Sequence, residues 1–198
     1  FIYNQLALNP DISASLIKLS YKQDNGEEQA LSEEEAKIAE NAWRILFDIS
    51  FCPCVDDKGI YYIDQIANWL AEFLKITKNN NQSEIGMRIL GKFLAHFPKG
   101  VYETWLPKEI CQFIEDNRIH NNKINSDLTS GFIIECYNNV GPHFINEGKE
   151  NIPLIVEYTS YAKATELNYP CIAGVFRNIA SKFEQESRDR RECAIHEY

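Results

Sequence analysis

The pair of cysteines in Phe51-Cys-Pro-Cys54 is the first feature of the sequence whose residue types and spacing could do chemistry. Two thiolates this close together can bind a soft metal ion. Zinc sites, however, normally place two or more residues between paired cysteines and use a second pair of ligands. No second closely spaced pair of cysteines occurs in the 198 residues. We therefore predict no metal site and no cofactor.

Histidines and glycines, which often carry catalysis and nucleotide binding, are scattered along the chain. The sequence contains no His-Glu-x-x-His motif and no Gly-rich phosphate loop. A hydrolase built on a Cys/His pair or on carboxylates would need those groups to meet in space, which sequence spacing does not show. We predict no catalytic residue. The histidines are His96, His120, His143 and His196.

The stretch from Asn138 to Gly148 joins two helical patterns and combines polar, aromatic and titratable side chains. Its Gly-Pro pair at 141–142 fits a helix end, because glycine adopts the left-handed conformation and proline prevents continuation. A turn alone does not require the side chains that follow, and exposed loop residues of this kind often bind partners. We predict a surface connection with partner-binding residues Asn138, His143, Phe144 and Asn146.

The overall charge limits the classes of partner. With 20 basic and 29 acidic residues the chain has a net charge of −9, which disfavours a surface that neutralises nucleic-acid phosphates. No apolar run approaches the roughly 20 residues that cross a bilayer, and no signal peptide opens the chain. We predict a soluble, cytoplasmic protein that binds a protein partner or other domains of the same chain, with no nucleic acid and no membrane. Its oligomeric state is left open.

Apolar residues recur at spacings of three and four in most segments, which is the period of an amphipathic helix. No segment shows the alternation of a strand convincingly. We predict an all-α fold, an irregular multi-helix array or bundle of about seven to nine helices. The predicted helices lie near residues 11–20, 32–50, 63–74, 84–97, 107–116, 126–139, 152–168 and 170–191, with a short one before Pro10.

Two of these helices carry more specific expectations. Ser32 followed by Glu35 is a capping box, which predicts the start of the helix that runs to about Ser50. Apolar residues line two sides of that helix, including Trp43 and Phe47, so we predict a central rather than peripheral helix. The last helix has one continuous apolar stripe, made of Ile172, Val175, Phe176, Ile179, Ala180 and Phe183.

The length of the chain suits one sizeable hydrophobic core, so we predict a single all-α domain over residues 1–198. The chain opens at Phe1 and its one methionine is Met87, from which we expect a fragment of a longer protein. The six cysteines are too sparse for a disulfide scaffold. The four that lie inside helical patterns, Cys111, Cys136, Cys171 and Cys193, are interpreted as small apolar residues or surface thiols kept reduced in the cytosol.

Several short segments occur in an order that resembles one group of proteins. They are 31–46, Asn68-Trp-Leu70, Ile85-Gly86, Leu94-Ala-His-Phe-Pro98, Trp105-Leu-Pro107, Gly131-Phe132, Asn138-Asn-Val-Gly141 and 169–191. In these segments the chain resembles the C-terminal helical region of large uncharacterised bacterial multidomain proteins. The resemblance implies a terminal module of a larger protein and no known reaction. The chain departs from that family at Val140, where the family has an arginine, and at Glu150-Asn-Ile-Pro153, where it has a Gly-Gly-x-Glu-Arg-like element.

Three functions are compatible with these patterns. We expect first a non-enzymatic helical protein-interaction module of a larger bacterial protein. The alternative is a free-standing acidic inhibitor or immunity-type protein, whose surface from Asp24 to Glu40 covers a basic partner. The third and least favoured is a Cys/His or carboxylate hydrolase, which a thiol or imidazole joined to a second titratable group in a deep pocket would support.

Overall fold

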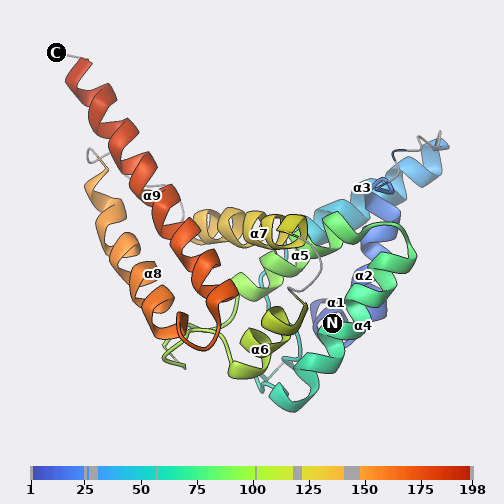
Figure 1. Ribbon diagram of the computed structural model, residues 1–198. Helices are drawn as coiled ribbons and strands as arrows, with labels where there is room; N and C mark the ends of the chain where they lie inside the picture. The colour runs from blue at the N-terminus through green and yellow to red at the C-terminus, as the bar shows by residue number, and fades with distance from the viewer. Residues whose placement is uncertain are drawn as a thin grey trace. The chain divides into compact units, whose positions relative to one another are not determined.

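The computed structural model describes residues 2–24, 26, 31–56, 58–100, 102–117, 122–140 and 148–196. Within these residues the chain forms nine α-helices and no strand (Figure 1). The extended pairing found there is an isolated antiparallel bridge between Val55 and Tyr61. The prediction of an all-α array of about seven to nine helices is therefore confirmed.

The helices group into two compact units. The first unit holds residues 1–97 and 121–135, and the second holds residues 98–120 and 136–198. The division falls within α7 (Asn122–Val140), after Glu135. That the whole chain folds as a single domain stays a prediction.

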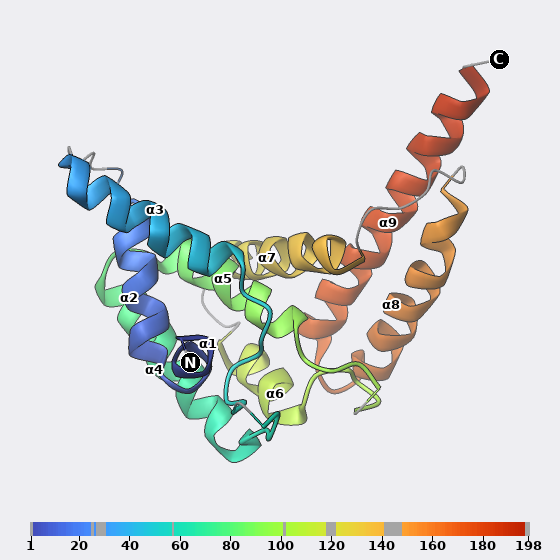
Figure 2. The ribbon, with the colours of Figure 1, turned by 180° about the vertical axis from the view of Figure 1, so that it is seen from behind.

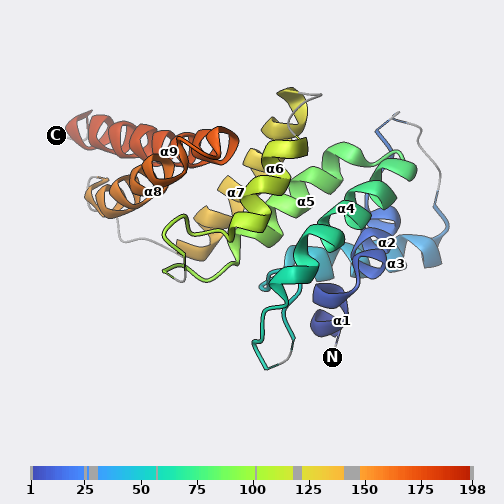
Figure 3. The ribbon, with the colours of Figure 1, turned by 60° about the horizontal axis from the view of Figure 1, so that its bottom comes forward.

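The first unit is organised around α2, which contacts α1, α3, α4 and α5 (Figure 3). An aromatic cluster fills its core. Trp69 and Phe73 stack with ring centroids 5.2 Å apart, and Phe93 meets both rings edge-on. Such offset and edge-on arrangements are the favourable ones for aromatic pairs. The helices are α1 (Ile2–Leu8), α2 (Pro10–Ser20), α3 (Glu33–Phe47), α4 (Ile63–Asn79) and α5 (Ser83–Ala95).

The start of α3 is the one that the sequence predicts. The Ser32 hydroxyl accepts a hydrogen bond of 3.3 Å from the Glu35 backbone N–H, and the Glu35 carboxylate accepts one of 2.8 Å from the Ser32 backbone N–H. These reciprocal bonds satisfy two donors that a helix N-terminus otherwise leaves unpaired. The capping box is therefore confirmed.

The prediction that α3 is a central helix is wrong. Within the helix Ala42 and Leu46 are buried, whereas Ile38, Trp43 and Phe47 are 52%, 42% and 58% exposed. The helix packs on α2 through part of its apolar surface, and it lies on the near side of the first unit in Figure 2. Periodicity shows how wide the apolar surface of a helix is, but it does not show how much of that surface is covered.

Helices α5 and α7 approach each other closely through glycine. A Cβ at Gly91 would lie 2.2 Å from the Leu128 carbonyl oxygen, so a larger residue would force the helices apart. This approach brings Arg88 within 3.2 Å of Asp127 and Lys92 within 3.4 Å of Glu135. Because both pairs advance together along the chain, the two helices run in the same direction.

The second unit is built on the helical hairpin of α8 and α9, which lie side by side in Figures 1 and 2. Helix α9 begins at Pro170, as predicted, and its whole predicted apolar stripe is buried. Phe183 in that stripe stacks on Tyr158 of α8 at 5.8 Å. The elements are α6 (Lys108–Asn117), the end of α7, the 3-10 turn η2 (Lys149–Asn151), α8 (Ile152–Thr165) and α9 (Pro170–His196).

Candidate functional site

Of the four residues predicted to bind a partner, the structure describes one. Asn138 lies near the end of α7, and its side chain is exposed. His143, Phe144 and Asn146 lie outside the described residues. A partner contact at these positions therefore stays a prediction.

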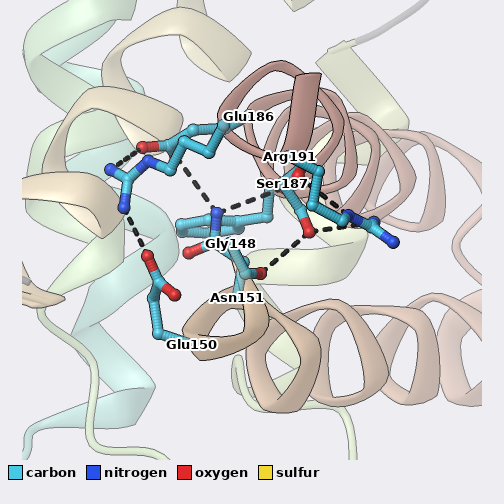
Figure 4. Close-up of polar contacts among 8 residues, drawn as sticks. Gly148, Glu150, Asn151, Glu186, Ser187 and Arg191 are labelled. Atoms are coloured by element: carbon cyan, nitrogen blue, oxygen red, sulfur yellow. Dashed lines mark hydrogen bonds and ion pairs between the residues drawn. The ribbon is translucent and has the colours of Figure 1, made fainter. Parts of the chain in front are cut away.

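A buried polar cluster holds the chain at residue 148, where the predicted connection ends (Figure 4). Gly148 has a φ of 75°, and a Cβ there would lie 2.6 Å from Ser187 Cα, so glycine is required. Its carbonyl oxygen accepts a hydrogen bond of 2.8 Å from the Ser187 hydroxyl of α9. The buried Asn151 side chain donates to the Phe183 carbonyl oxygen at 3.3 Å. These contacts fix segment 148–151 against α9.

Charged side chains around this anchor neutralise one another. Arg190 of α9 forms ion pairs with Glu150 and Glu186. The Tyr137 hydroxyl hydrogen-bonds the Glu186 carboxylate, and burial together with this negative charge raises the pKa of Tyr137. With Arg191, which contacts Ser187 in the same cluster, two cations balance these two carboxylates and leave no net charge for an additional charged ligand.

The hydroxyl in the anchor, that of Ser187, is not prepared for catalysis. Arg191 donates to the Ser187 hydroxyl oxygen and to its carbonyl oxygen, at 3.1 Å each (Figure 4). A nucleophilic serine needs a general base beside its hydroxyl, whereas this one donates to the Gly148 carbonyl and accepts from an arginine. We interpret the cluster as the structural anchor of the segment that follows the predicted connection.

The buried thiols likewise have the wrong electrostatics for nucleophiles. Burial raises the pKa of Cys52 to about 12, that of Cys54 to about 11 and that of Cys111 to about 12. Reactive cysteines have a lowered pKa, so these thiols stay protonated near neutral pH. Among the described residues, no group of three His, Cys, Asp or Glu side chains could hold a metal ion. That Cys52 and Cys54 bind no metal remains a prediction.

A buried lysine fixes the C-terminal end of α3 in the first unit. Lys92 of α5 is 8% exposed, and its ammonium group donates to the carbonyl oxygens of Leu46 and Phe47 at 3.1 and 3.0 Å. These carbonyls belong to the last turn of α3, where a cation is favoured. The Glu135 carboxylate lies 3.4 Å from the same ammonium group and compensates its charge. Lys92 thereby joins α3, α5 and α7.

Above this lysine, α3 exposes a pair of aromatic rings. Trp43 and Phe47 stack with centroids 5.0 Å apart and planes inclined by 24°. The Trp43 side chain hydrogen-bonds Tyr21, and the Lys92 ammonium lies 5.4 Å from the Phe47 ring centroid. Both rings are therefore held in place from below while about half of each remains open to solvent.

An ion pair of α5 and α7 lies near the ring pair, because Arg88 and Trp43 both interact with Tyr21. Arg88 of α5 lies one turn before Lys92 and pairs with Asp127 of α7 at 3.2 Å. We call the surface formed by Trp43 and Phe47, with Arg88 near its edge, the α3 face.

Sequence analysis did not identify the α3 face as a site. One signal is that apolar residues line two sides of α3, because this pattern fits either a central helix or a peripheral helix with a contact surface. The position of Lys92 was a second signal, since a lysine within the apolar segment from Met87 to Ala95 needs a buried acceptor or a carboxylate. Neither signal shows by itself which helix of the chain the residue contacts.

No helix in the described ranges combines the length and apolar character needed to span a bilayer. A comparison of the chain with family models, curated proteins and solved structures found no match. The resemblance to large bacterial multidomain proteins therefore stays a prediction.

Proposed function

We propose that this chain is a protein-interaction module that binds a partner protein through the α3 face. The observation that carries the proposal is the exposed, stacked pair of Trp43 and Phe47. Tryptophan and other aromatic side chains dominate the binding energy of interfaces, and rigid rings lose little conformational entropy on binding. The contacts of Lys92 and Tyr21 hold these two rings in place before any partner arrives.

The charge of α3 supports a basic partner. Residues 33–48 contain five acidic and two basic side chains. Both bases are already paired, Lys37 with Glu33 at 3.3 Å and Arg44 with Glu40 at 2.6 Å. A partner segment with apolar residues flanked by lysine or arginine would complement both the rings and the remaining negative charge. We therefore propose such a segment of another protein as the occupant of the α3 face.

The cellular setting proposed from the sequence accompanies this function. The resemblance supports a module of a larger bacterial protein. Described cysteines that are thiols rather than disulfides support a reducing compartment such as the cytoplasm. The high pKa values of the buried thiols disfavour the hydrolase hypothesis, because a thiol nucleophile needs the opposite shift.

The negative charge of α3 also favours the second candidate, an acidic inhibitor. The two functions share the α3 face and a basic partner, but they differ in what binding does. An inhibitor abolishes an activity of its partner when bound in stoichiometric amount, whereas an interaction module leaves the partner active. An activity assay on the purified partner, with and without this chain, separates them.

Photo-crosslinking from the α3 face tests the proposal. A photoreactive phenylalanine analogue at position 47 should crosslink to a partner segment that mass spectrometry can identify. The same analogue in place of Val156, an exposed apolar residue of α8 in the second unit, is the matched control. Glu34→Lys should lower the crosslinking yield at position 47, because it reduces the charge that attracts a basic segment.

The proposal is supported if position 47, and not position 156, crosslinks to an apolar segment with net positive charge. It is overturned if both positions give the same products. A crosslink to a second copy of this chain, or to an acidic segment, also overturns it.

A further inference from the structure

A lysine ammonium group in the second unit lies over two adjacent aromatic rings. Lys99 Nζ is 5.0 Å from the Trp105 ring centroid and 4.8 Å from the Tyr158 ring centroid. Both distances fall within the range of a cation–π contact, in which the negative face of the ring attracts the cation. The two rings are themselves neighbours, with centroids 5.8 Å apart and planes inclined by 51°. One side of the ammonium group therefore contacts two adjacent rings.

Polar groups complete the surroundings of this cation. The Glu157 carboxylate lies 3.1 Å from Lys99 Nζ, and the Tyr158 hydroxyl oxygen accepts from Nζ at 3.3 Å. Glu157 is in turn held by a hydrogen bond of 3.3 Å from the Tyr161 hydroxyl. Two rings, a carboxylate and a hydroxyl are the groups that recognise alkylammonium ligands in proteins.

The walls of this site are rigid. Trp105 and Tyr158 are each 1% exposed, and Trp105 also packs against Tyr161 and Phe176 with centroids 5.6 and 5.8 Å away. The Trp105 backbone has a φ of 64°, a left-handed conformation that costs a bulky residue free energy. Strain of this kind at a ring that contacts a cation suggests a binding role.

Lys99, in contrast, can be displaced from the rings. The Lys99 side chain is 39% exposed, and the next residue is Gly100 with a φ of 81°. Glycine leaves the backbone beside Lys99 with more conformational freedom than any other residue would. The lysine can therefore leave the rings without disturbing the buried aromatic cluster beneath it.

We propose that Trp105, Tyr158 and Glu157 form an alkylammonium-binding site that Lys99 occupies and closes. The ligand class is a positively charged alkylammonium group, either on a small molecule such as choline or on a methylated lysine of a peptide. A tethered occupant is present at high effective concentration, so the wild-type chain binds an external ammonium ligand weakly. Removal or displacement of Lys99 opens the site. This proposal uses contacts of the second unit and does not depend on the α3 face.

Titration of the Lys99→Ala variant of the full chain with choline tests the inference. We expect binding with a dissociation constant on the order of millimolar, and binding to wild type that is at least about tenfold weaker. Shifts of the tryptophan indole N–H signals in NMR report the contact, because Trp105 forms one wall of the site. Lys163→Ala, which removes an exposed lysine of α8, is the control and should bind choline no better than wild type.

Two further binding measurements identify the chemical class of the ligand. The neutral isostere 3,3-dimethyl-1-butanol has the shape of choline without its charge and should bind Lys99→Ala at least about tenfold more weakly. Peptides with trimethyllysine or unmodified lysine separate a peptide source from a small molecule. Tighter binding of the trimethyllysine peptide than of choline assigns the methylated peptide, and the reverse order assigns the small molecule.

Circular dichroism establishes that Lys99→Ala is folded, and Lys99→Gln provides a second neutral variant of nearly the same length. The proposal is overturned if both variants are folded and neither binds choline. It is equally overturned if choline and the neutral isostere bind alike, or if wild type binds choline as tightly as Lys99→Ala.

Discussion

Two lysines in the described part of the chain lie over aromatic rings, and the exposure of cation and ring is reversed between them. In the first unit Lys92 is 8% exposed while the ring above it, Phe47, is 58% exposed. In the second unit the rings of Trp105 and Tyr158 are 1% exposed while the Lys99 side chain is 39% exposed. In the first unit a buried lysine therefore supports an exposed ring. In the second unit two buried rings bind a partly exposed lysine.

This difference separates structural groups from groups available for binding. Lys92 is compensated by Glu135 and by the end of α3, so it cannot leave without removing a cation from a buried carboxylate that otherwise has His96 beside it. Phe47 can be covered by a partner at little cost. In the second unit the rings belong to the core, and the lysine is the group that can move.

The largest expected effect comes from removing a ring of the second unit. Phe176→Ala should lower the free energy of unfolding by about 3–5 kcal/mol, because the ring is fully buried and its loss leaves a cavity. Phe47→Ala removes the same atoms from a half-exposed position and should cost less than about 1 kcal/mol. Chemical denaturation of both variants measures the difference. Equal losses would remove the distinction between a core ring and a contact ring.

Replacing the lysines should lower the free energy of unfolding more in the first unit than in the second, which is the opposite order to the ring replacements. Lys92→Met should destabilise the chain by about 3 kcal/mol, because it leaves the Glu135 carboxylate buried without its lysine. Lys99→Met should cost less than about 1 kcal/mol, since its ion pair with Glu157 is half exposed.

The double variant Lys92→Met with Glu135→Met is the control for this explanation. It should recover at least half of the lost stability, because an apolar pair needs no charge compensation. If it is as unstable as Lys92→Met alone, the loss comes from the end of α3 and not from the carboxylate.

Alkaline pH should lower the stability of both units through their buried thiols. The contribution of each thiol should be smaller than the effects of the ring and lysine replacements above. Burial raises the pKa of Cys52 to about 12, while the unfolded chain has an ordinary thiol pKa of about 8.5. The folded state therefore keeps a proton that the unfolded state loses, and stability falls as pH rises from about 8.5 towards 12.

Cys52→Ala removes this contribution and should make stability fall less steeply between about pH 9 and 11. Urea denaturation at several pH values measures the slope, with Cys171→Ala as a matched control at a half-buried thiol. Identical slopes in wild type and Cys52→Ala would show that the thiol does not titrate differently in the two states.

The sequence predicts some of this organisation because local patterns decide it. Ser32 and Glu35 lie three residues apart, so the start of α3 follows from sequence alone. The stripe of α9 is equally direct, because its apolar residues, among them Phe176 and Phe183, share one side of the helix and that side is buried.

The candidate sites are not predictable in this way because they join distant segments. Lys92 and Phe47 are 45 residues apart, and Lys99 and Tyr158 are 59 residues apart. Sequence periodicity does not indicate that Lys92 of α5 contacts the end of α3. It also does not indicate that Lys99, in the segment after α5, contacts Tyr158 of α8. The left-handed backbone of Trp105 is a further tertiary effect, because tryptophan has no intrinsic preference for it.

The affinity of the α3 face for the partner segment identified by crosslinking is the most direct test of the proposed function. Phe47→Ala and Val156→Ala should both keep the stability of wild type to within about 1 kcal/mol. Of the two, Phe47→Ala alone should weaken binding of that segment, by at least about tenfold, because a central aromatic anchor is lost. If Phe47→Ala is folded and binds the segment as tightly as wild type does, the α3 face is not the contact surface.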